Sequence, residues 1–250
     1  MESLYKNKKI KLHSQIRIPE AELIMAKTFI TLAEKIGFRL HITHVSNPET
    51  IDVIEKSHHI ITTDVTIHHL LLNNDIEEKI GYLAKVNPPL RSEVTRQRLY
   101  NYFIKNKIDA IISDHAPHSL EEKLNDNYEF VPPGFPGVEL VLHLLMTEII
   151  EGRLPLNAIE YYSSKPASII GIKRGKISLG YYADFTIYDV KQKWKIKGSN
   201  LVSKAKYTPF ENQIIKGKVS EVFIRGTKAY ENEVFLVNPG FGIRWKKVYE

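Results

Sequence analysis

The chain has no cysteine among its 250 residues. Disulfide bonds are therefore excluded, and histidine, aspartate, glutamate or a modified side chain would have to hold any metal ion. The chain also has no run near the ~20 apolar residues of a membrane span, and its N-terminal segment MESLYKNKKIKLHSQ lacks the apolar core of a signal peptide. We therefore expect a cytoplasmic protein that does not associate with membranes.

Blocks of like charge are missing as well. The 35 basic and 29 acidic residues give a net charge of +6, and they are spread along the chain. Such a surface favours solubility and a mild attraction to anions. Because the sequence has no motif typical of nucleic-acid recognition, we do not expect nucleic acid as a partner. A hydrophobic content of 43% is enough for a sizeable core.

Apolar strand-like segments alternate with amphipathic segments through the first two thirds of the chain. In residues 19–36, Met25, Phe29, Leu32, Ala33 and Ile36 form one apolar helical face, which we expect to be buried. This alternation predicts parallel strands joined by right-handed crossovers. Strands are expected over 38–45, 59–66 and 108–113, and helices over 19–36 (ended by Gly37), 48–56, 93–105 (capped by Ser92), 138–150 and 155–164.

The pattern changes after about residue 172. Residues 175–190 alternate with period two, and residues 217–235 contain two strand-like runs with a turn near Gly226. Such a pattern is typical of an antiparallel sheet. We therefore expect an α/β domain over 1–172 and a β-rich region over 173–250.

Polar residues follow each of the three predicted parallel strands. The segment HITHVS (41–46) places His44 at one strand end, and SDHAPH (113–118) places Asp114 at another. In parallel α/β folds, ligands bind at the carboxyl ends of the strands. A histidine or an aspartate at a strand end can also be purely structural, as a hydrogen-bonded terminus or the cap of a turn, so each residue alone leaves both readings open.

Five motifs in order along the chain carry a resemblance to a known family. The sequence resembles the cyclic amidohydrolases and, within them, the dihydroorotases. This resemblance implies the C-terminal portion of a (β/α)8 TIM-type metal-dependent hydrolase barrel, followed by strands of a small β-sandwich. The motifs are HVS (44–46), TIHHLLL (66–72), NPPLR (87–91), SDHAPH (113–118) and PPGFPGVE (132–139).

The resemblance also implies roles for individual residues. His44 and Asp114 correspond to zinc ligands, and Asp114 is in addition the general base and acid. Asn87, His118 and the backbone of Pro133 and Gly134 correspond to substrate-binding groups. The implied reaction is the zinc-dependent, reversible cyclisation of N-carbamoyl-L-aspartate to dihydroorotate in pyrimidine synthesis, with two zinc ions in a complete site.

The sequence departs from the family at its N-terminal end. Members of the family open with a His-x-His strand and an arginine, followed by a bridging lysine or aspartate and a His-Ala-Glu segment, and none of these is present. We therefore expect the chain to correspond to the part of the enzyme from before barrel strand six onward. An isolated chain with His44 and Asp114 alone would bind zinc weakly and have no turnover.

Two other functions stay open at this stage. One is another cyclic amidohydrolase, such as a dihydropyrimidinase or hydantoinase, although NPPLR and DHAPH favour dihydroorotase. The other is a non-catalytic, dihydroorotase-like partner of aspartate transcarbamoylase, which fits the missing ligands. A homo-oligomer is a further expectation. We expect His68, His69 and His115 to be structural and do not expect His13 to bind metal.

Overall fold

The computed structural model describes residues 13–125 and 127–243. Internal contacts divide the chain into two compact units. The first contains the residues up to Val141 together with Lys197–Asn212, and the second contains Leu142–Ile196 and the residues from Gln213 onward. This division rests on contacts and does not test the boundary that the strand patterns predict at residue 172.

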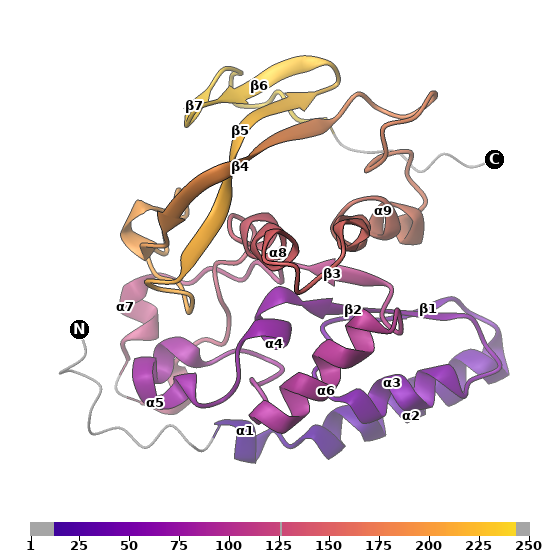
Figure 1. Cartoon of the computed structure of the whole chain (residues 1–250). Coiled ribbons are helices and arrows are strands. Elements are labelled where there is room, and N and C mark those ends of the chain that lie inside the picture. The colour runs from indigo at the N-terminus through magenta and orange to yellow at the C-terminus, as the bar shows by residue number, and fades with distance from the viewer. Residues whose placement is uncertain (1–12, 126, 244–250) are drawn as a thin grey trace. The chain divides into compact units, whose positions relative to one another are not determined.

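The first unit is built on a three-stranded parallel sheet in the order β1-β2-β3 (Figure 1). Its strands are β1 (Leu40–Ile42), β2 (Ile61–Thr66) and β3 (Ala110–Ile112). The predicted parallel strands are confirmed, but each is shorter than its apolar run. β1 and β3 end early because the backbone turns sharply just beyond them, at the motifs HVS and SDHAPH.

The long helices α2 (Pro19–Ile36), α3 (Pro48–Glu55) and α6 (Glu93–Ile104) lie on one side of this sheet (Figure 1). The predicted Ser92 cap is confirmed, since its hydroxyl accepts a hydrogen bond from the Thr95 amide at 3.3 Å. Shorter elements complete the unit: α1 (His13–Ile16), α4 (Ile67–Leu71), α5 (Ile76–Ile80), α7 (Leu120–Lys123) and 3₁₀ turns at Gly81–Ala84, Tyr128–Phe130 and Gly198–Asn200.

Helix α2 confirms one prediction and corrects another. The helix ends as expected at Gly37, which has the left-handed φ of 82°. The predicted buried face is wrong, however, because four of its five members are between 40% and 71% exposed. The helix packs beside α3 and β1 through a neighbouring stripe of Ala26, Ile30 and Ala33. Two alanines in that stripe allow close approach of the backbones. The exposed members are Met25, Phe29, Leu32 and Ile36.

One hydrophobic cluster of the first unit joins segments far apart in the sequence. Leu83, Val86 and Leu90 come from the segment that contains NPPLR, and Phe135 comes from PPGFPG. Ala205 and Tyr207, from the returning segment 197–212, pack on them. The cluster therefore fixes the loop of residues 132–137 against the segment that carries Asn87.

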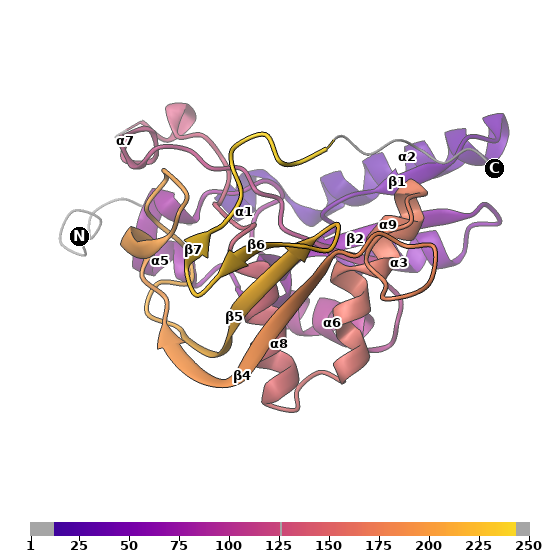
Figure 2. The same cartoon turned by 90° about the horizontal axis from the view of Figure 1, so that it is seen from above.

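The second unit contains a four-stranded antiparallel sheet, in which β4 and β5 are the two long curved strands (Figure 2). The predicted strands and the turn near Gly226 are confirmed over 217–235, whereas only the last six residues of 175–190 are in the sheet. The strands are β4 (Phe185–Lys195), β5 (Ile214–Ile224), β6 (Thr227–Glu231) and β7 (Val234–Phe235).

The helices of this unit include a correction. Helix α8 (Val141–Ile150) starts slightly later than predicted. The α-helix predicted over 155–164 is wrong, because Leu156–Tyr162 is a 3₁₀ helix and α9 covers Ser164–Ile170. At Ser163, φ and ψ are −130° and −87°, which breaks the helix between the two elements. Among the described residues, no helix is long and apolar enough to span a membrane.

The packing of α6 leads to a stability prediction. Leu99 is 1% exposed, whereas Val94 on the same helix is 70% exposed. Leu99→Ala should lower the free energy of unfolding by about 2–5 kcal/mol, because it leaves a cavity. The matched control Val94→Ala should change it by less than about 0.5 kcal/mol. Urea unfolding of both variants tests this; equal losses would contradict the packing of α6.

Candidate functional site

His44 and Asp114 occupy equivalent positions at the ends of two parallel strands. Each lies two residues beyond the last residue of its strand, β1 or β3. Each also has a left-handed backbone, with φ of 45° for His44 and 42° for Asp114. Non-glycine residues seldom adopt this conformation, and strained positions of this kind cluster at functional sites. The strand ends therefore carry the two predicted ligands on sharply turned backbone.

Asp64 in β2 holds the turn that carries His44. Its carboxylate accepts hydrogen bonds from the His44 amide at 2.5 Å, the Thr43 hydroxyl at 3.1 Å and His41 Nε2 at 2.7 Å. The same geometry confirms that His41 and Thr43 share one face of the sheet. Sequence reasoning missed Asp64. The only hint was a charged residue inside the apolar strand segment IITTDVT.

The electrostatic environment links Asp114 to the same strand ends. Burial raises the pKa of the half-buried Asp114 carboxyl, His44 lowers it, and the nearby Asp64 raises it. The structure therefore brings His44, Asp114 and Asp64 within electrostatic range of one another. A carboxyl group in such an environment is a candidate for general acid–base chemistry.

The segments SDHAPH and PPGFPG form a second contact region. The Ala116 amide donates to the Phe135 carbonyl at 2.9 Å, and His115 forms a β-bridge with Phe135. A Cβ added to Gly134 would lie 2.5 Å from the Ala116 carbonyl oxygen and 3.3 Å from Cδ2 of His118. The structure therefore brings the predicted substrate-binding residues Gly134 and His118 together.

His115 has the supporting position that the sequence predicts. Its Nδ1 accepts hydrogen bonds from the amides of Gly137 at 3.1 Å and Val138 at 3.3 Å. These bonds tie the residue after Asp114 to the end of the PPGFPG segment. The ring therefore orders the loop.

Asn87 is placed to receive a hydrogen-bond donor. Its Oδ1 is buried and has no partner among the described residues. A buried polar atom without a partner is costly, so such an atom in a native protein is a candidate contact for a ligand. His13 supports the same segment, because its Nε2 bonds to the Val86 carbonyl at 2.8 Å.

Of the two buried histidines in TIHHLLL, His69 is a structural residue. Its ring bonds to the Thr66 hydroxyl at 2.7 Å and to the Pro88 carbonyl at 3.0 Å, and burial lowers its pKa to about 3. Burial also lowers the pKa of His68 well below its usual value. His68 Nε2 is buried and has no partner within the described part of the chain. His69 thus links β2 to the cluster around NPPLR.

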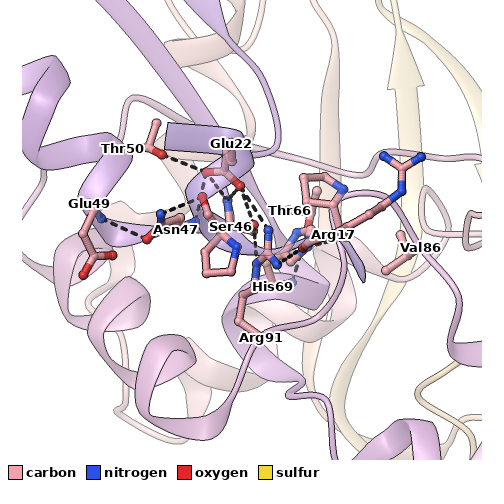
Figure 3. Close-up of polar contacts among 12 residues, drawn as sticks. Arg17, Glu22, Ser46, Asn47, Glu49, Thr50, Thr66, His69, Val86 and Arg91 are labelled. Carbon is pink, nitrogen blue, oxygen red and sulfur yellow. Dashed lines mark hydrogen bonds and ion pairs between the residues drawn. The ribbon is translucent and has the colours of Figure 1, made fainter. Parts of the chain in front are cut away.

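Arg91 of NPPLR forms an ion pair with Glu22 of helix α2 and a hydrogen bond with Ser46 of HVS (Figure 3). Arg91 Nε donates to the Ser46 hydroxyl at 2.9 Å, and Arg91 lies 3.6 Å from the Glu22 carboxylate. That carboxylate accepts from the amides of Ser46 and Asn47 and from the hydroxyls of Ser46 and Thr50. Sequence reasoning noticed NPPLR but did not find its partner Glu22, which lies almost 70 residues earlier on helix α2.

The acidic and histidine side chains at the strand ends do not complete a metal centre. Over residues 13–125 and 127–243, no group of three or more His, Asp or Glu side chains is close enough to hold a metal ion. His44 and Asp114 could contribute an imidazole and a carboxylate, which are two of the four ligands typical of zinc.

The close approach at Gly134 gives a test of the contact region. Gly134 and Gly37 both have positive φ, but a Cβ on Gly37 would meet no atom within 4 Å. Gly37→Ala should cost about 1–2 kcal/mol of unfolding free energy, for the backbone alone. Gly134→Ala should cost about 1–3 kcal/mol more, because the Ala116 carbonyl must move. Chemical denaturation of both variants measures these losses of unfolding free energy. Equal losses would contradict the packing of residues 132–137 on residues 116–118.

Several curated dihydroorotases are similar to this chain. The chain is 39% identical over 239 residues to a dihydroorotase from Methanosphaera stadtmanae, covering 93% of this chain and 54% of that protein. It is 38% identical to a dihydroorotase from Thermococcus kodakarensis, and the match covers 89% of this chain and 53% of that protein. The chain thus spans about half the length of the curated relatives that it matches.

Solved structures agree on the fold. A D-hydantoinase (dihydropyrimidinase) from Thermus sp. superposes with a TM-score of 0.87 at 26% identity, covering 94% of this chain and 54% of that one. An L-hydantoinase (dihydropyrimidinase) from Arthrobacter aurescens superposes with a TM-score of 0.80 at 29% identity. The match covers 85% of this chain and 49% of that one.

The match to the family described as "Amidohydrolase family" extends over residues 26–229. The fold class expected from the sequence is confirmed, namely α/β with parallel strands of a TIM-type hydrolase barrel and a small antiparallel sheet. With the matched region covering most of its length, this chain belongs to the amidohydrolase family.

Proposed function

We propose that the chain carries active-site residues of a dihydroorotase, which interconverts N-carbamoyl-L-aspartate and dihydroorotate. The observation that carries the proposal is the placement of His44 and Asp114 on left-handed backbone at the ends of parallel strands β1 and β3. The names of the curated relatives support the same reaction. Pyrimidine synthesis in the cytoplasm is the setting that this reaction suggests.

The donor set at the strand ends suits zinc. An imidazole and a carboxylate are both common zinc ligands, so His44 and Asp114 are proposed to hold the ion, with two ions in a complete site. Bound there, zinc would act as a Lewis acid toward the amide carbonyl of the substrate. Asp64 would support this site by fixing the His44 amide at 2.5 Å.

Asp114 is proposed to transfer the proton. In ring opening, water adds to the carbonyl carbon and the ring C–N bond breaks. The Asp114 carboxylate takes a proton from the attacking water and returns one to the departing nitrogen. Ring closure reverses these transfers and releases water. The burial that raises the pKa of Asp114 suits a group that must act in both directions.

Substrate recognition is proposed for Asn87, His118 and the backbone of Pro133 and Gly134. Asn87 offers a buried acceptor without a partner among the described residues, which suits an N–H of the ureido group. His118 lies beside Gly134 and offers a ring N–H to an anionic oxygen. Fixed donors around a substrate carboxylate would favour an anionic ring over a neutral one.

A second candidate is dihydropyrimidinase or hydantoinase activity, since both solved structures described above carry these names. Their identities of 26–29% are lower than those of the curated dihydroorotases, which makes this the weaker proposal. A non-catalytic role beside aspartate transcarbamoylase, or assembly as a homo-oligomer, is proposed as a further alternative.

The reaction can be tested in a chimera. The segment of the Methanosphaera stadtmanae dihydroorotase that matches this chain would be replaced by the matching segment of this chain. With zinc present, we expect the chimera to hydrolyse dihydroorotate in preference to dihydrouracil and hydantoin. Asp114→Asn should lower kcat at least about 10²-fold, because proton transfer is lost. Asp75→Asn, an exposed matched control, should leave kcat unchanged. Preference for the neutral rings would favour the second candidate.

The isolated chain gives a separate test of the zinc ligands. Zinc titration followed by calorimetry should show weak binding by the unmodified chain, without turnover of dihydroorotate. His44→Ala and Asp114→Asn should each weaken this binding further, whereas His59→Ala should not. Tight stoichiometric zinc, or binding indifferent to both substitutions, would contradict the assigned ligands.

A further inference from the structure

Lys123 is a fully buried lysine between SDHAPH and PPGFPG. Its exposed fraction is 0%, and it closes the short helix α7. That helix begins with a capping box, in which Ser119 Oγ accepts from the Glu122 amide at 3.2 Å and Glu122 Oε2 accepts from the Ser119 amide at 2.7 Å. Because the capped turn fixes the path of the chain, it directs Lys123 inward.

The Lys123 ammonium donates to three backbone carbonyls. Its Nζ lies 2.8 Å from the oxygen of Lys85, 3.1 Å from that of Pro132 and 3.3 Å from that of Gly134. An ammonium has three N–H donors, so these acceptors use all of them. Two of the three carbonyls come from the segment that contains Pro133 and Gly134.

The same carbonyls are shared with other donors. The Gly134 amide donates to the Lys85 carbonyl at 2.9 Å, and the Tyr207 hydroxyl donates to the Gly134 carbonyl at 3.1 Å. Lys123 therefore adds a side-chain link, beside this backbone hydrogen bond, between the segment of Lys85, two residues before Asn87, and the loop of 132–137. Without the ammonium, the Lys85 and Gly134 carbonyls would each keep another donor.

The position of Gly134 matters for its neighbours. A Cβ there would overlap Ala116 and approach His118, so the two loops are in close contact. A shift of a few tenths of an ångström in the carbonyls that accept from Lys123 would therefore change the spacing between Gly134 and His118. A misplacement of about 1 Å in a binding site can cost about 10²-fold in rate, so a smaller shift here would still weaken substrate binding.

A buried ammonium is a costly way to fill this space. Burial and, to a smaller extent, the nearby Lys85 charge lower the pKa of Lys123 to about 7. The rings of Phe135 and Tyr207, with centroids 5.9 Å and 6.0 Å from Nζ, offset part of that cost. Packing alone would be served at less cost by a methionine of similar volume.

We propose that Lys123 is a positioning residue that sets the Pro133–Gly134 backbone against His118 for substrate binding. This inference rests on the proposed function, in which that backbone contacts the substrate. The Lys123 ammonium acts through the loop and does not itself touch the substrate.

The first experiment measures the loop directly. Backbone hydrogen exchange of the full chain would be compared for the unmodified protein, Lys123→Met and the exposed control Lys79→Met. In Lys123→Met, exchange at the amides of Ala116, Gly134 and Gly137 should rise at least about tenfold, which corresponds to about 1.4 kcal/mol. Exchange in α2 and α6 should stay unchanged. Unchanged exchange at the three loop amides would overturn the inference.

A chemical rescue separates the charge from the packing. Because the chain has no cysteine, Lys123→Cys provides a single thiol that can be alkylated in denaturant before refolding. Aminoethylation restores a lysine-like ammonium, whereas ethylation gives a side chain without it. Only the aminoethylated form should restore slow exchange in the loop. If the methionine and ethylated forms fail to fold while the aminoethylated form folds, Lys123 is a folding residue and the inference is wrong.

Kinetics in the chimera distinguish the two proposals. If the chimera is active, Lys123→Met should raise KM for dihydroorotate at least about tenfold with little change in kcat, as expected for lost substrate binding. An unchanged KM would overturn the positioning role while leaving the proposed reaction intact. If the chimera is inactive, the proposed reaction fails, and the loop exchange alone decides whether Lys123 sets the loop.

Discussion

The ion pair between the partly buried Glu22 and the buried Arg91 is the interaction on which the first unit depends. The Glu22 carboxylate accepts hydrogen bonds from the amides of Ser46 and Asn47. The Arg91 guanidinium donates to the Ser46 hydroxyl in the same turn. Removing Glu22 would leave the buried Arg91 charge without its carboxylate partner, which costs more than losing a surface ion pair. Helix α2, the turn after β1 and the NPPLR segment are therefore held as one body, and His44 lies within that body.

The other side of the candidate site is organised by backbone carbonyls. Lys123 and Tyr207 both donate to the Gly134 carbonyl, and His115 accepts from the amide of Gly137. These contacts hold the PPGFPG loop against SDHAPH. The ligand-binding groups of the proposed site thus lie on loops, which are held by the buried side chains of Lys123 and Tyr207 and by the exposed His115.

Much of the fold could be predicted from local pattern. Apolar runs located the three parallel strands, and Ser92 and Gly37 located helix ends, because caps and strands leave short-range signatures. The buried face of α2 could not be predicted this way. The most apolar stripe, with Met25 and Phe29, is exposed. The stripe with the small residues Ala26 and Ala33 is buried against the neighbouring elements. Which stripe is buried depends on the neighbouring elements, and periodicity does not specify them.

The sequence by itself determined the family resemblance and the identity of the candidate residues, because motifs such as NPPLR and SDHAPH are contiguous. Only the tertiary structure decided how these motifs are joined. Asp64 reaches the turn of His44 from the next strand, Glu22 reaches Arg91 across 69 positions, and Lys123 bridges two loops. These contacts link residues distant in sequence, so their partners are set by chain topology and packing, which no local pattern encodes.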